Sequence, residues 1–351
     1  MDLCSILRLR WPLLQAPMAG VSTSEMAAAV SNVGGLGALG LGAAGVDGAR
    51  AMIRAARALT DRSINANVFC HAPALRDADV EADWLAALAP TFSRFGAKPP
   101  AALHEIYTSF VVDRAMCDML IEEAPGVVSL HFGLPEKAWI AELQAAGNLV
   151  FASTTNVAEA RACEAAGVDA IVAQGIEAGG HRGAFDPDAE DEALPTLALV
   201  ERVAAACELP VIAAGGLMDG GDVARALGRG AVAAQLGTAF LDCTESAADA
   251  AYRAALRDPE QGPPVLTTSI SGRAARCMRN DFVELGQGLH AKVPDYPVTY
   301  DAGKALNAAA KAAGETGFGA QWAGTGVARM PSGGAAEILE AIGRELDAAQ
   351  A

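Results

Sequence analysis

The sequence predicts an α/β protein, a (β/α)₈ TIM barrel that carries a smaller, mostly helical cap. The chain has 351 residues, of which 52% are hydrophobic and 19% charged, which is typical of a packed globular protein large enough for a barrel with additions. Short apolar runs alternate with alanine-rich stretches of helical period, as in parallel βαβ units. Eight such runs occur, and that number favours a closed barrel.

The expected strands combine an apolar core with a polar or glycine end. They are Leu13–Pro17, Leu36–Leu39, Ile64–Phe69, Val127–Phe132, Leu149–Ser153, Ala170–Gln174, Pro210–Ala214 and Ala231–Leu236. Helical periodicity over Ser24–Asn32, Asn156–Ala166 and Gly221–Leu227 predicts helices between them. An amphipathic helix over residues 333–350 is expected to close the chain.

Two long stretches interrupt this alternation. Residues 73–114 separate the third and fourth strands, and residues 256–332, with many Pro and Gly residues, follow the eighth helix. We expect both stretches to form the cap over the barrel mouth. Residues 1–72, 115–255 and 333–351 are then expected to form the barrel.

The loop after the sixth strand, Gly175–Pro195, is longer than its neighbours and carries His181 among glycines. In a barrel the loop that follows a strand lies at the carboxyl-terminal face, where active sites form. The acidic run 186–192 within this loop lacks the ligand spacing of a calcium loop, so we expect it to be solvated. No metal site is expected from the sequence.

Two glycine turns lie where barrels commonly hold a phosphate. Gly215 and Gly216 follow the seventh strand, and Gly237 and Thr238 follow the eighth, each before a helix. Glycine allows main-chain N–H groups to approach phosphate oxygens, and a helix N-terminus favours an anion. The two turns together predict a phosphate site.

A further glycine-rich stretch matches a dinucleotide fingerprint in the wrong context. Residues 35–40 and 40–45 both satisfy G-x-G-x-x-G. That fingerprint requires a preceding strand and a following helix, whereas here a helix is expected first and a strand within the stretch. We therefore expect no Rossmann site at this position.

Charge and cysteine content argue against several classes of partner. The 42 acidic residues against 26 basic ones give a net charge of -16, which repels nucleic acid and anionic membranes. No run of eighteen apolar residues and no convincing signal peptide occur.

The seven cysteines are scattered, without a C-x-x-C pair, as in a reducing compartment. We expect a cytoplasmic protein.

Six motifs along the chain carry a specific resemblance. They are Gln15–Gly20 (QAPMAG), residues 34–37 (GGLG), Asn65–Asn67 (NAN), Glu177–His181 (EAGGH), Ala213–Gly216 (AAGG) and Gln235–Thr238 (QLGT). In this order they resemble the nitronate monooxygenase family (formerly 2-nitropropane dioxygenases), which are FMN-containing barrels. The segments Ser271–Arg273 and Gln321–Gly324 resemble its class I branch. Ala-Pro-Met and the glycine–histidine motif also occur in FMN-dependent enoyl-acyl-carrier-protein reductases.

The resemblance implies FMN as the cofactor and assigns its contacts residue by residue. They are Ala16, Pro17, Met18, Asn67, Gln174, Gly179, Gly180, Gly216, Gln235, Leu236, Gly237 and Thr238. Amide side chains such as Asn67 can donate to and accept from the polar edge of the flavin ring. An ordinary strand-end glutamine is the alternative interpretation of Gln174.

His181 is the expected catalytic residue. A neutral imidazole can take a proton from a nitroalkane carbon, and its N–H can donate a hydrogen bond to a nitronate oxygen. His131 ends the fourth strand, and the resemblance implies that it binds substrate; the alternative is a barrel histidine satisfied by its neighbours. The remaining histidines, at 71, 104 and 290, are expected in loops or on the surface.

A tyrosine–lysine cluster in the cap is a candidate anion site. Tyr296, Tyr300 and Lys304 follow one another at steps of four, which on a helix places them along one face. Phenol hydroxyls and an ammonium can bind a small anion. The resemblance adds Tyr107. A tyrosine stripe that packs the cap onto the barrel is the alternative.

The resemblance implies an enzyme that uses O₂ to oxidise alkyl nitronates, such as propionate 3-nitronate, to a carbonyl compound and nitrite. No reduced nicotinamide is then required. The nearest alternative is an FMN-dependent NAD(P)H reductase of a quinone or of an enoyl-acyl carrier protein. A flavin-free, phosphate-binding lyase or isomerase is more distant. A monomer and a homodimer are both compatible with the sequence.

Overall fold

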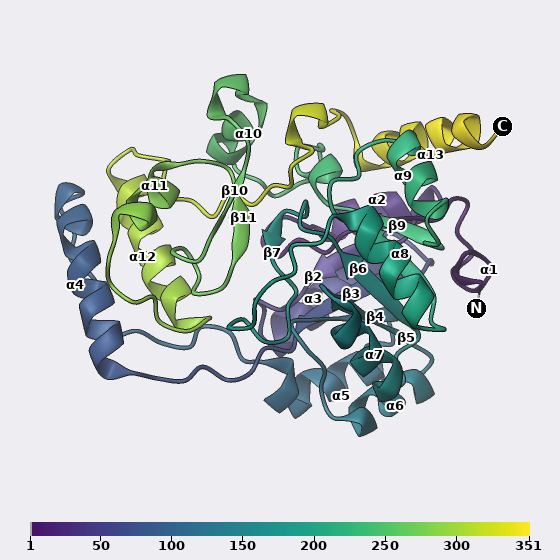
Figure 1. The fold of residues 1–351 in the computed structure, drawn as a ribbon, viewed down its shortest axis with the longest axis horizontal. Helices are drawn as coiled ribbons and strands as arrows, with labels where there is room; N and C mark the ends of the chain where they lie inside the picture. The colour runs from purple at the N-terminus through teal and green to yellow at the C-terminus, as the bar shows by residue number, and fades with distance from the viewer. Residues whose placement is uncertain (1) are drawn as a thin grey trace.

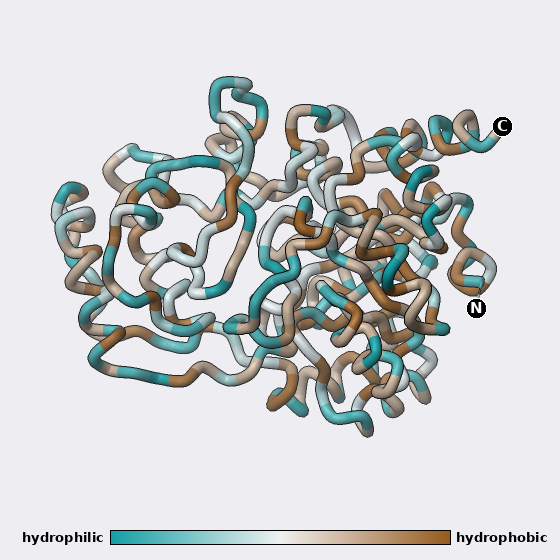
Figure 2. The backbone as a smooth tube through the Cα atoms, in the orientation of Figure 1, coloured by the Kyte–Doolittle hydropathy of each residue, from teal (hydrophilic) through white to brown (hydrophobic). Residues whose placement is uncertain are grey.

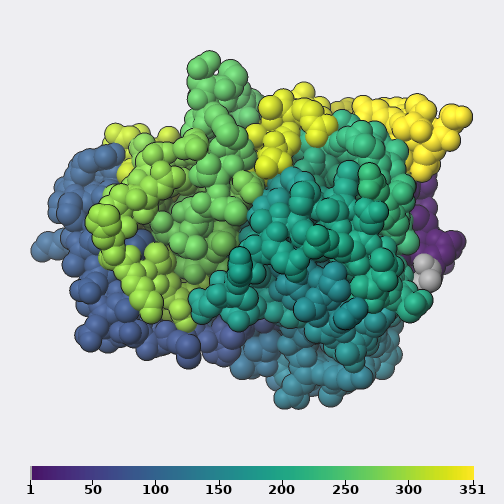
Figure 3. Space-filling model, viewed as in Figure 1, coloured from purple at the N-terminus to yellow at the C-terminus, as the bar shows by residue number. Residues whose placement is uncertain are grey.

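The computed structural model describes residues 2–351. The barrel, with both chain termini, lies at one end of the molecule, and a smaller cap built around α4, α11 and α12 lies at the other (Figure 1). In the space-filling view the side chains of cap and barrel meet along a broad contact (Figure 3). The most hydrophobic stretches of backbone gather in the barrel (Figure 2).

Eight parallel strands form the barrel, as predicted. They are β1 (Leu13–Gln15), β2 (Gly37–Gly40), β3 (Ile64–Phe69), β4 (Gly126–His131), β5 (Leu149–Thr154), β6 (Ala170–Gln174), β8 (Val211–Ala214) and β9 (Ala233–Leu236). Their order is β1-β9-β8-β6-β5-β4-β3-β2. A parallel bridge between Leu14 and Leu36 joins the two ends of this sheet and closes the ring. The expected strands are therefore confirmed, with ends that differ by a few residues.

Helices cover the outside of this ring. They are α2 (Ser24–Asn32), α3 (Val46–Arg57), α5 (Arg114–Glu123), α6 (Lys137–Ala145), α7 (Val157–Ala166), α8 (Thr196–Ala206), α9 (Gly220–Leu227) and the closing helix α13 (Ala335–Gln350). Several begin at a side chain that accepts a main-chain N–H, such as Thr23 for α2, Asn156 for α7 and Asp219 for α9. These caps explain why the helices start where they do.

Apolar side chains fill the amino-terminal end of the barrel. Leu3 and Leu7 of the short helix α1 (Leu3–Leu7) pack with Val127, Phe151 and Ala170, which stand at or near the starts of their strands. Because this end is filled, space for a ligand remains at the opposite end, where the carboxyl ends of the strands meet.

The cap has a hydrophobic core of its own. Its helices are α4 (Ala78–Arg94), α11 (Asp281–Gly288) and α12 (Val298–Ala312), and α10 (Ala250–Arg257) projects beside them (Figure 1). Trp84 and Phe92 of α4 pack there with Phe282, Leu306 and Phe318. Short 3-10 turns complete the chain at Phe110–Val112, Thr238–Phe240, Pro259–Gln261 and Val327–Arg329.

A small antiparallel sheet, which was not predicted from the sequence, connects barrel and cap. Its strands are β10 (Val265–Thr267), β11 (Ala275–Cys277) and β7 (Gly180–His181), in the order β10-β11-β7. The strand β7 belongs to the long loop after β6, and it pairs His181 with Ala275 and Gly180 with Arg276. The loop is therefore held by the cap rather than free.

The glycine-rich stretch 35–45 serves packing, in agreement with the rejection of a Rossmann site. The helix α2 precedes it, and β2 lies within it. A Cβ built on Gly37 would lie 1.9 Å from the carbonyl oxygen of Ala27 in α2. Glycine at 37 therefore allows helix and strand to approach closely. None of the helices within residues 2–351 combines the length and the hydrophobicity that a membrane span requires.

This close approach gives a stability test. Gly37→Ala should lower the free energy of unfolding by about 3 kcal/mol, because the added methyl group overlaps the main chain of α2. Gly48 is the matched control, since it lies exposed in α3, where an added Cβ would be 3.8 Å from its nearest neighbour. Gly48→Ala should raise stability by about 0.5–1 kcal/mol. Urea unfolding of both variants measures the difference, and equal effects would contradict this account of Gly37.

Candidate active site

One cavity of about 330 Å³ opens between the barrel mouth and the cap. The predicted site residues that line it come from both parts of the chain: Ala16, Pro17, Met18, Asn67, Tyr107, His131, Gln174, Gly179, Gly180, His181, Gly216, Gln235, Gly237, Thr238, Tyr296, Tyr300 and Lys304. Leu236 is the exception. Its side chain is 1% exposed and packs in the barrel core, because alternate residues of a strand point to opposite faces.

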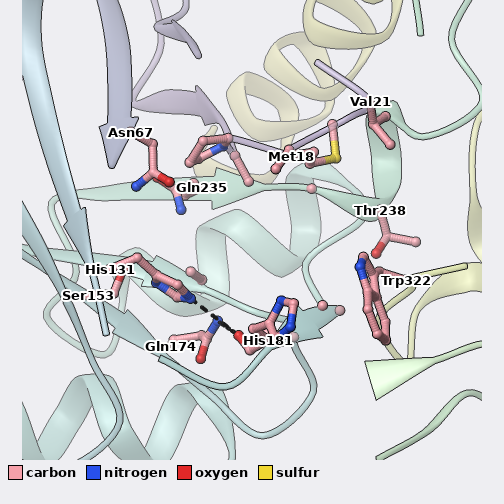
Figure 4. A pocket seen from close by; sticks show the side chains of 18 of the residues that line it. Met18, Val21, Asn67, His131, Ser153, Gln174, His181, Gln235, Thr238 and Trp322 are labelled. Carbon is pink, nitrogen blue, oxygen red and sulfur yellow. Dashed lines mark hydrogen bonds between the residues drawn. The ribbon is translucent and has the colours of Figure 1, made fainter. Parts of the chain in front are cut away.

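The loop after β1 forms one wall of the cavity and is held by Gln15. Its Nε2 donates to the carbonyl oxygen of Ala16 (2.8 Å), and its Oε1 accepts from the N–H of Ala38 in β2 (2.8 Å). Ser22 Oγ accepts from the N–H of Met18 (3.0 Å). The main chain from Ala16 to Met18 is thereby fixed beside the cavity (Figure 4).

The two glycine turns meet at one edge of the same cavity. Gly216 has a φ of +70°, a conformation that favours glycine. The main-chain N–H groups of Gly216, Gly237 and Thr238 donate to no acceptor in the described part of the chain, residues 2–351. Three unpaired donors at one edge form a suitable anion site. The Oγ1 of Thr238 accepts from the N–H of Gly324 (2.9 Å), which brings the C-terminal segment against this edge.

The three amide side chains of the site differ in how much hydrogen bonding they have left. Asn67 donates through Nδ2 to the carbonyl oxygen and to Oγ of Ser129, both at 3.0 Å, so its Oδ1 remains as an acceptor. Gln235 lines the cavity near Asn67 (Figure 4). Gln174 instead uses both ends of its amide: Nε2 donates to the carbonyl oxygen of His181 (3.0 Å), and Oε1 accepts from the N–H of Gly183 (2.7 Å).

Gln174 and Arg182 anchor the loop that carries His181. The buried guanidinium of Arg182 donates to the carbonyl oxygens of Gln174 (2.8 Å) and Gly175 (3.1 Å) and pairs with Asp191 at 2.8 Å. One member of the acidic run is thus part of this anchor, while Asp186, Asp188 and Glu190 are exposed, as expected. The flavin contact expected of Gln174 stays a prediction.

His181 faces the cavity inside an aromatic cluster. Its ring centroid lies 5.1 Å from that of Trp322, 5.4 Å from Tyr296 and 5.7 Å from Phe132. Burial, with His131 and Arg273 close by, lowers the pKa of His181 to about 3. The imidazole is therefore neutral near pH 7 and has a lone pair available to accept a proton.

His131 lies beside His181 at the end of β4. Its Nε2 donates to the carbonyl oxygen of His181 at 3.4 Å (Figure 4). Burial and the nearby Arg273 lower the pKa of His131 to about 4. The structure thus places His131 on the cavity wall and gives it a partner within the chain; the substrate contact expected of it stays a prediction.

His71 lies in a loop, as expected, but the structure also shows that it is buried. It is 1% exposed, its ring centroid lies 4.9 Å from that of Tyr296, and both ring nitrogens are buried without a hydrogen-bond partner in residues 2–351. Burial lowers the pKa of His71 to about 4. The residue comes just after β3, where the local sequence does not show that the cap will cover it. His104 and His290 are exposed or partly exposed, as expected.

The predicted tyrosine–lysine cluster forms over the cavity. Tyr300 and Lys304 lie on α12, and Tyr296 comes just before it. The Nζ of Lys304 lies 4.8 Å from the ring centroid of Tyr107 and 5.5 Å from that of Tyr300. Tyr107 therefore reaches the pocket from the first cap segment. Desolvation raises the pKa of Tyr107 to about 12 and also raises the pKa of Tyr296 and Tyr300, so all three phenols keep their protons.

Several lining residues were not among the predicted ones. Trp322, Tyr252, Ser129 and Ser153 contribute side chains to the cavity wall. Tyr252 donates its hydroxyl to the carbonyl oxygen of Trp322. Trp322 stands in the Gln321–Gly324 motif, which was the sequence signal for it, although no local pattern showed that this segment folds back onto the barrel.

The residues present fit an FMN molecule. Free N–H donors at the glycine turns suit its phosphate, and the free Oδ1 of Asn67 suits a donor on its ring. A buried hydroxyl of Tyr296 without a partner in residues 2–351 faces the same pocket. Buried polar groups without partners are rare in native proteins, so this set indicates a polar ligand.

Fold and site together define a barrel protein with an anion edge, a neutral histidine and a tyrosine–lysine cluster around one cavity. The family model for nitronate monooxygenase matches residues 2–345. The chain belongs to the nitronate monooxygenase family.

Individual relatives agree with this membership. The chain is 57% identical over 345 residues to a nitronate monooxygenase of Paraburkholderia phytofirmans, covering 98% of this chain and 94% of that protein. It is 49% identical over 342 residues to a nitronate monooxygenase of Pseudomonas aeruginosa, covering 97% of each.

Solved structures show the same fold. A nitroalkane oxidase from Streptomyces ansochromogenes has a TM-score of 0.92 and 37% identity, and the match covers 100% of this chain and 99% of that one. FabK from Thermotoga maritima has a TM-score of 0.74 and 27% identity, with 99% and 96% covered.

The buried His71 gives a test of acid stability. Its folded pKa of about 4 lies below the ordinary 6.5, so the unfolded chain takes up a proton first as the pH falls, and stability is lost between pH 6.5 and pH 4. Between pH 7 and pH 5 the wild type should lose about 2 kcal/mol more than His71→Phe. Urea unfolding at both pH values measures this. The exposed His290 is the control, since His290→Gln should keep the wild-type dependence, and an unchanged dependence in His71→Phe would contradict the assignment.

Proposed function

We propose that this protein uses O₂ to oxidise alkyl nitronates to a carbonyl compound and nitrite, with FMN as its cofactor. The family is one of flavin enzymes. The observation that carries the proposal is the cavity itself, in which unpaired main-chain donors and a neutral imidazole line the same space. A location in the cytoplasm and membership of the class I branch stay predictions.

FMN would be held by the barrel mouth. We propose that Gly216, Gly237 and Thr238 bind its phosphate through main-chain N–H groups, and that Asn67 and Gln235 bind the polar edge of its ring. The main chain from Ala16 to Met18 would pack along the ring. When bound, FMN supplies an acceptor for the electrons of the nitronate.

His181 would act on the substrate carbon. With a neutral nitroalkane, the neutral imidazole takes a proton from the carbon next to the nitro group, and the electron pair of that bond moves onto the nitro oxygens. General-base catalysis of this kind is worth about 10²–10⁴ in rate. With a nitronate already formed, this step is not needed, and the aromatic cluster around His181 serves to exclude water.

The tyrosine–lysine cluster would bind the anionic substrate. The phenols of Tyr107, Tyr296 and Tyr300 keep their protons and can donate them to nitronate or carboxylate oxygens. The ammonium of Lys304 adds a charge-assisted hydrogen bond. Such a set favours a nitronate that carries a carboxylate, such as propionate 3-nitronate.

The similarity to FabK is the observation that favours the second candidate, an FMN-dependent NAD(P)H reductase of a quinone or an enoyl-acyl carrier protein. That similarity rests on 27% identity, against 57% and 49% for the two nitronate monooxygenases. The oxidase function therefore has the stronger support.

Spectra and oxygen consumption test the function. The purified protein should be yellow and release FMN on denaturation, and it should consume O₂ and produce nitrite with propionate 3-nitronate in the absence of any nicotinamide. Anaerobic NADH should leave the colour in place. Rapid bleaching by NADH, without oxygen consumption on the nitronate, would favour the reductase instead.

His181→Asn tests whether His181 is the base. It should keep the bound FMN, because the loop is anchored by Gln174 and Arg182, and it should lose most activity on a neutral nitroalkane, about 10²-fold or more. Turnover of neutral nitroalkane equal to the wild type would remove His181 as the base.

Lys304→Met tests the anion site. It should raise the KM for propionate 3-nitronate about tenfold, which corresponds to the loss of one charge-assisted hydrogen bond. The KM for an alkyl nitronate without a carboxylate should change much less. Lys311→Met is the control, because Lys311 lies on the same helix and pairs with Asp249 at 2.6 Å. Equal effects of Lys304→Met on both substrates would argue against a carboxylate site.

A further inference from the structure

Ser271 lies directly behind His181, outside the set of residues that line the cavity. Its side chain is fully buried, and its Oγ lies 2.9 Å from Nε2 of His181. Because it does not reach the cavity, Ser271 cannot act on a ligand directly. Any effect that it has on the reaction passes through the imidazole.

The serine hydroxyl has one hydrogen, and a carbonyl acceptor lies within its reach. The Oγ of Ser271 donates to the main-chain carbonyl oxygen of Arg273 at 3.2 Å. With that hydrogen used, the oxygen can only accept from His181. In that arrangement the hydrogen of the neutral imidazole resides on Nε2 and the lone pair on Nδ1.

We propose that Ser271 is a positioning residue that fixes His181 in the tautomer protonated at Nε2, so that Nδ1 is the atom that accepts the substrate proton. The role of Nδ1 as the base rests on the proposed function. The tautomer of His181 does not depend on that function.

The surrounding chain holds both partners of this hydrogen bond in place. The pairing of His181 with Ala275, and the bond from the N–H of Arg182 to the carbonyl oxygen of Ala274 (2.8 Å), tie the loop to the segment that follows Ser271. Gly272 has a φ of +89°, and a Cβ there would lie 2.6 Å from the carbonyl oxygen of Pro294. The turn is therefore packed closely against the chain leading to Tyr296.

Arg273 fixes the acceptor end of the same chain of hydrogen bonds. Its guanidinium carbon lies 4.3 Å from the ring centroid of Phe132, and its NH2 group donates to the carbonyl oxygen of Ala184. The buried side chain thereby anchors the residue whose main-chain carbonyl accepts from Ser271. The motif Ser271–Arg273 thus supplies the hydroxyl, the tight turn and the anchor.

The tautomer decides what chemistry the imidazole can perform. With the hydrogen on Nε2, Nδ1 accepts the proton of the carbon–hydrogen bond, a new N–H bond forms, and the electron pair left on carbon moves onto the nitro group. The imidazolium then keeps its Nε2–H bond to Ser271. With the hydrogen on Nδ1 instead, the ring could donate to a nitronate oxygen but could not take a proton from carbon at that atom.

Nitrogen NMR of the holoenzyme labelled at its five histidines tests the tautomer directly, with His181 assigned by its absence in His181→Asn. The wild type should show a protonated Nε2 and an unprotonated Nδ1 for His181 near pH 7. Ser271→Ala should shift this ring to a mixture of both tautomers. A wild-type ring protonated at Nδ1 would overturn the proposal, whether or not the protein oxidises nitronates.

Kinetics supply the second readout. In Ser271→Ala, kcat/KM for a neutral nitroalkane should fall about tenfold, as fewer molecules carry the productive tautomer, while kcat/KM for a preformed nitronate should change less than about threefold. In combination with His181→Asn, the serine substitution should add no further loss. Equal losses on both substrates, or no loss on either, would contradict a positioning role.

Ser269→Ala is the matched control. Ser269 is also buried and stands two residues from Ser271, but its hydroxyl bonds to Thr267 at 3.3 Å rather than to His181. It should leave the His181 tautomer and the ratio of the two kcat/KM values as in the wild type. Ser271→Thr keeps a hydroxyl, so its ratio of the two kcat/KM values should lie closer to the wild type than that of Ser271→Ala. A shift of the His181 tautomer in Ser269→Ala would instead show that packing alone is responsible.

Discussion

The antiparallel pairing of β7 with β11 is the constraint on which the rest of the site depends. Only Gly180 and His181 take part on the loop side, yet this pairing joins the barrel to the cap. It places the His181 ring among Phe132 from the barrel and Tyr296 and Trp322 from the cap. Without it, the loop after β6 would carry a histidine with no defined neighbours.

The electrostatics of the site follow from burial. The three histidines around Phe132, at positions 71, 131 and 181, are held neutral because burial disfavours the charged imidazole and Arg273 repels it. Burial lowers the pKa of Arg273 itself to about 10, so this guanidinium stays charged near pH 7. The histidines thus add no charge to the cavity, whose lining includes the ammonium of Lys304. This arrangement suits an anion and leaves an imidazole able to accept a proton.

Much of the fold could be predicted because it rests on local patterns. The eight strands are short apolar runs, and the helices between them have caps and periodicity that can be recognised in the sequence. The small sheet of the cap could not be predicted, because β7 and β11 are two and three residues long and lie far apart along the chain. Strand pairing of this kind depends on long-range contacts that no local window contains.

Candidate residues at the ends of strands were predictable for a related reason. In a parallel barrel the carboxyl ends of all strands meet at one face, which is where His131 and Gln174 were expected, while the resemblance assigned Asn67. The cavity is lined by all three. The resemblance assigned a whole motif that includes Leu236, whereas strand alternation turns the side chain of this residue into the core; its flavin contact stays a prediction. The burial of His71 was not foreseen, because it depends on the cap that covers the end of β3.

The sequence by itself determined the barrel, the position of its mouth, the glycine turns and the identity of the histidine and tyrosine–lysine candidates, since each depends on residue type and spacing. Only the tertiary structure decided which of these groups touch. The low pKa of the imidazoles, the reach of Tyr107 to Lys304 and the hydrogen bond from His181 to Ser271 arise from contacts between segments remote in the chain. Burial and hydrogen-bond direction are properties of such contacts, and composition and periodicity do not specify them.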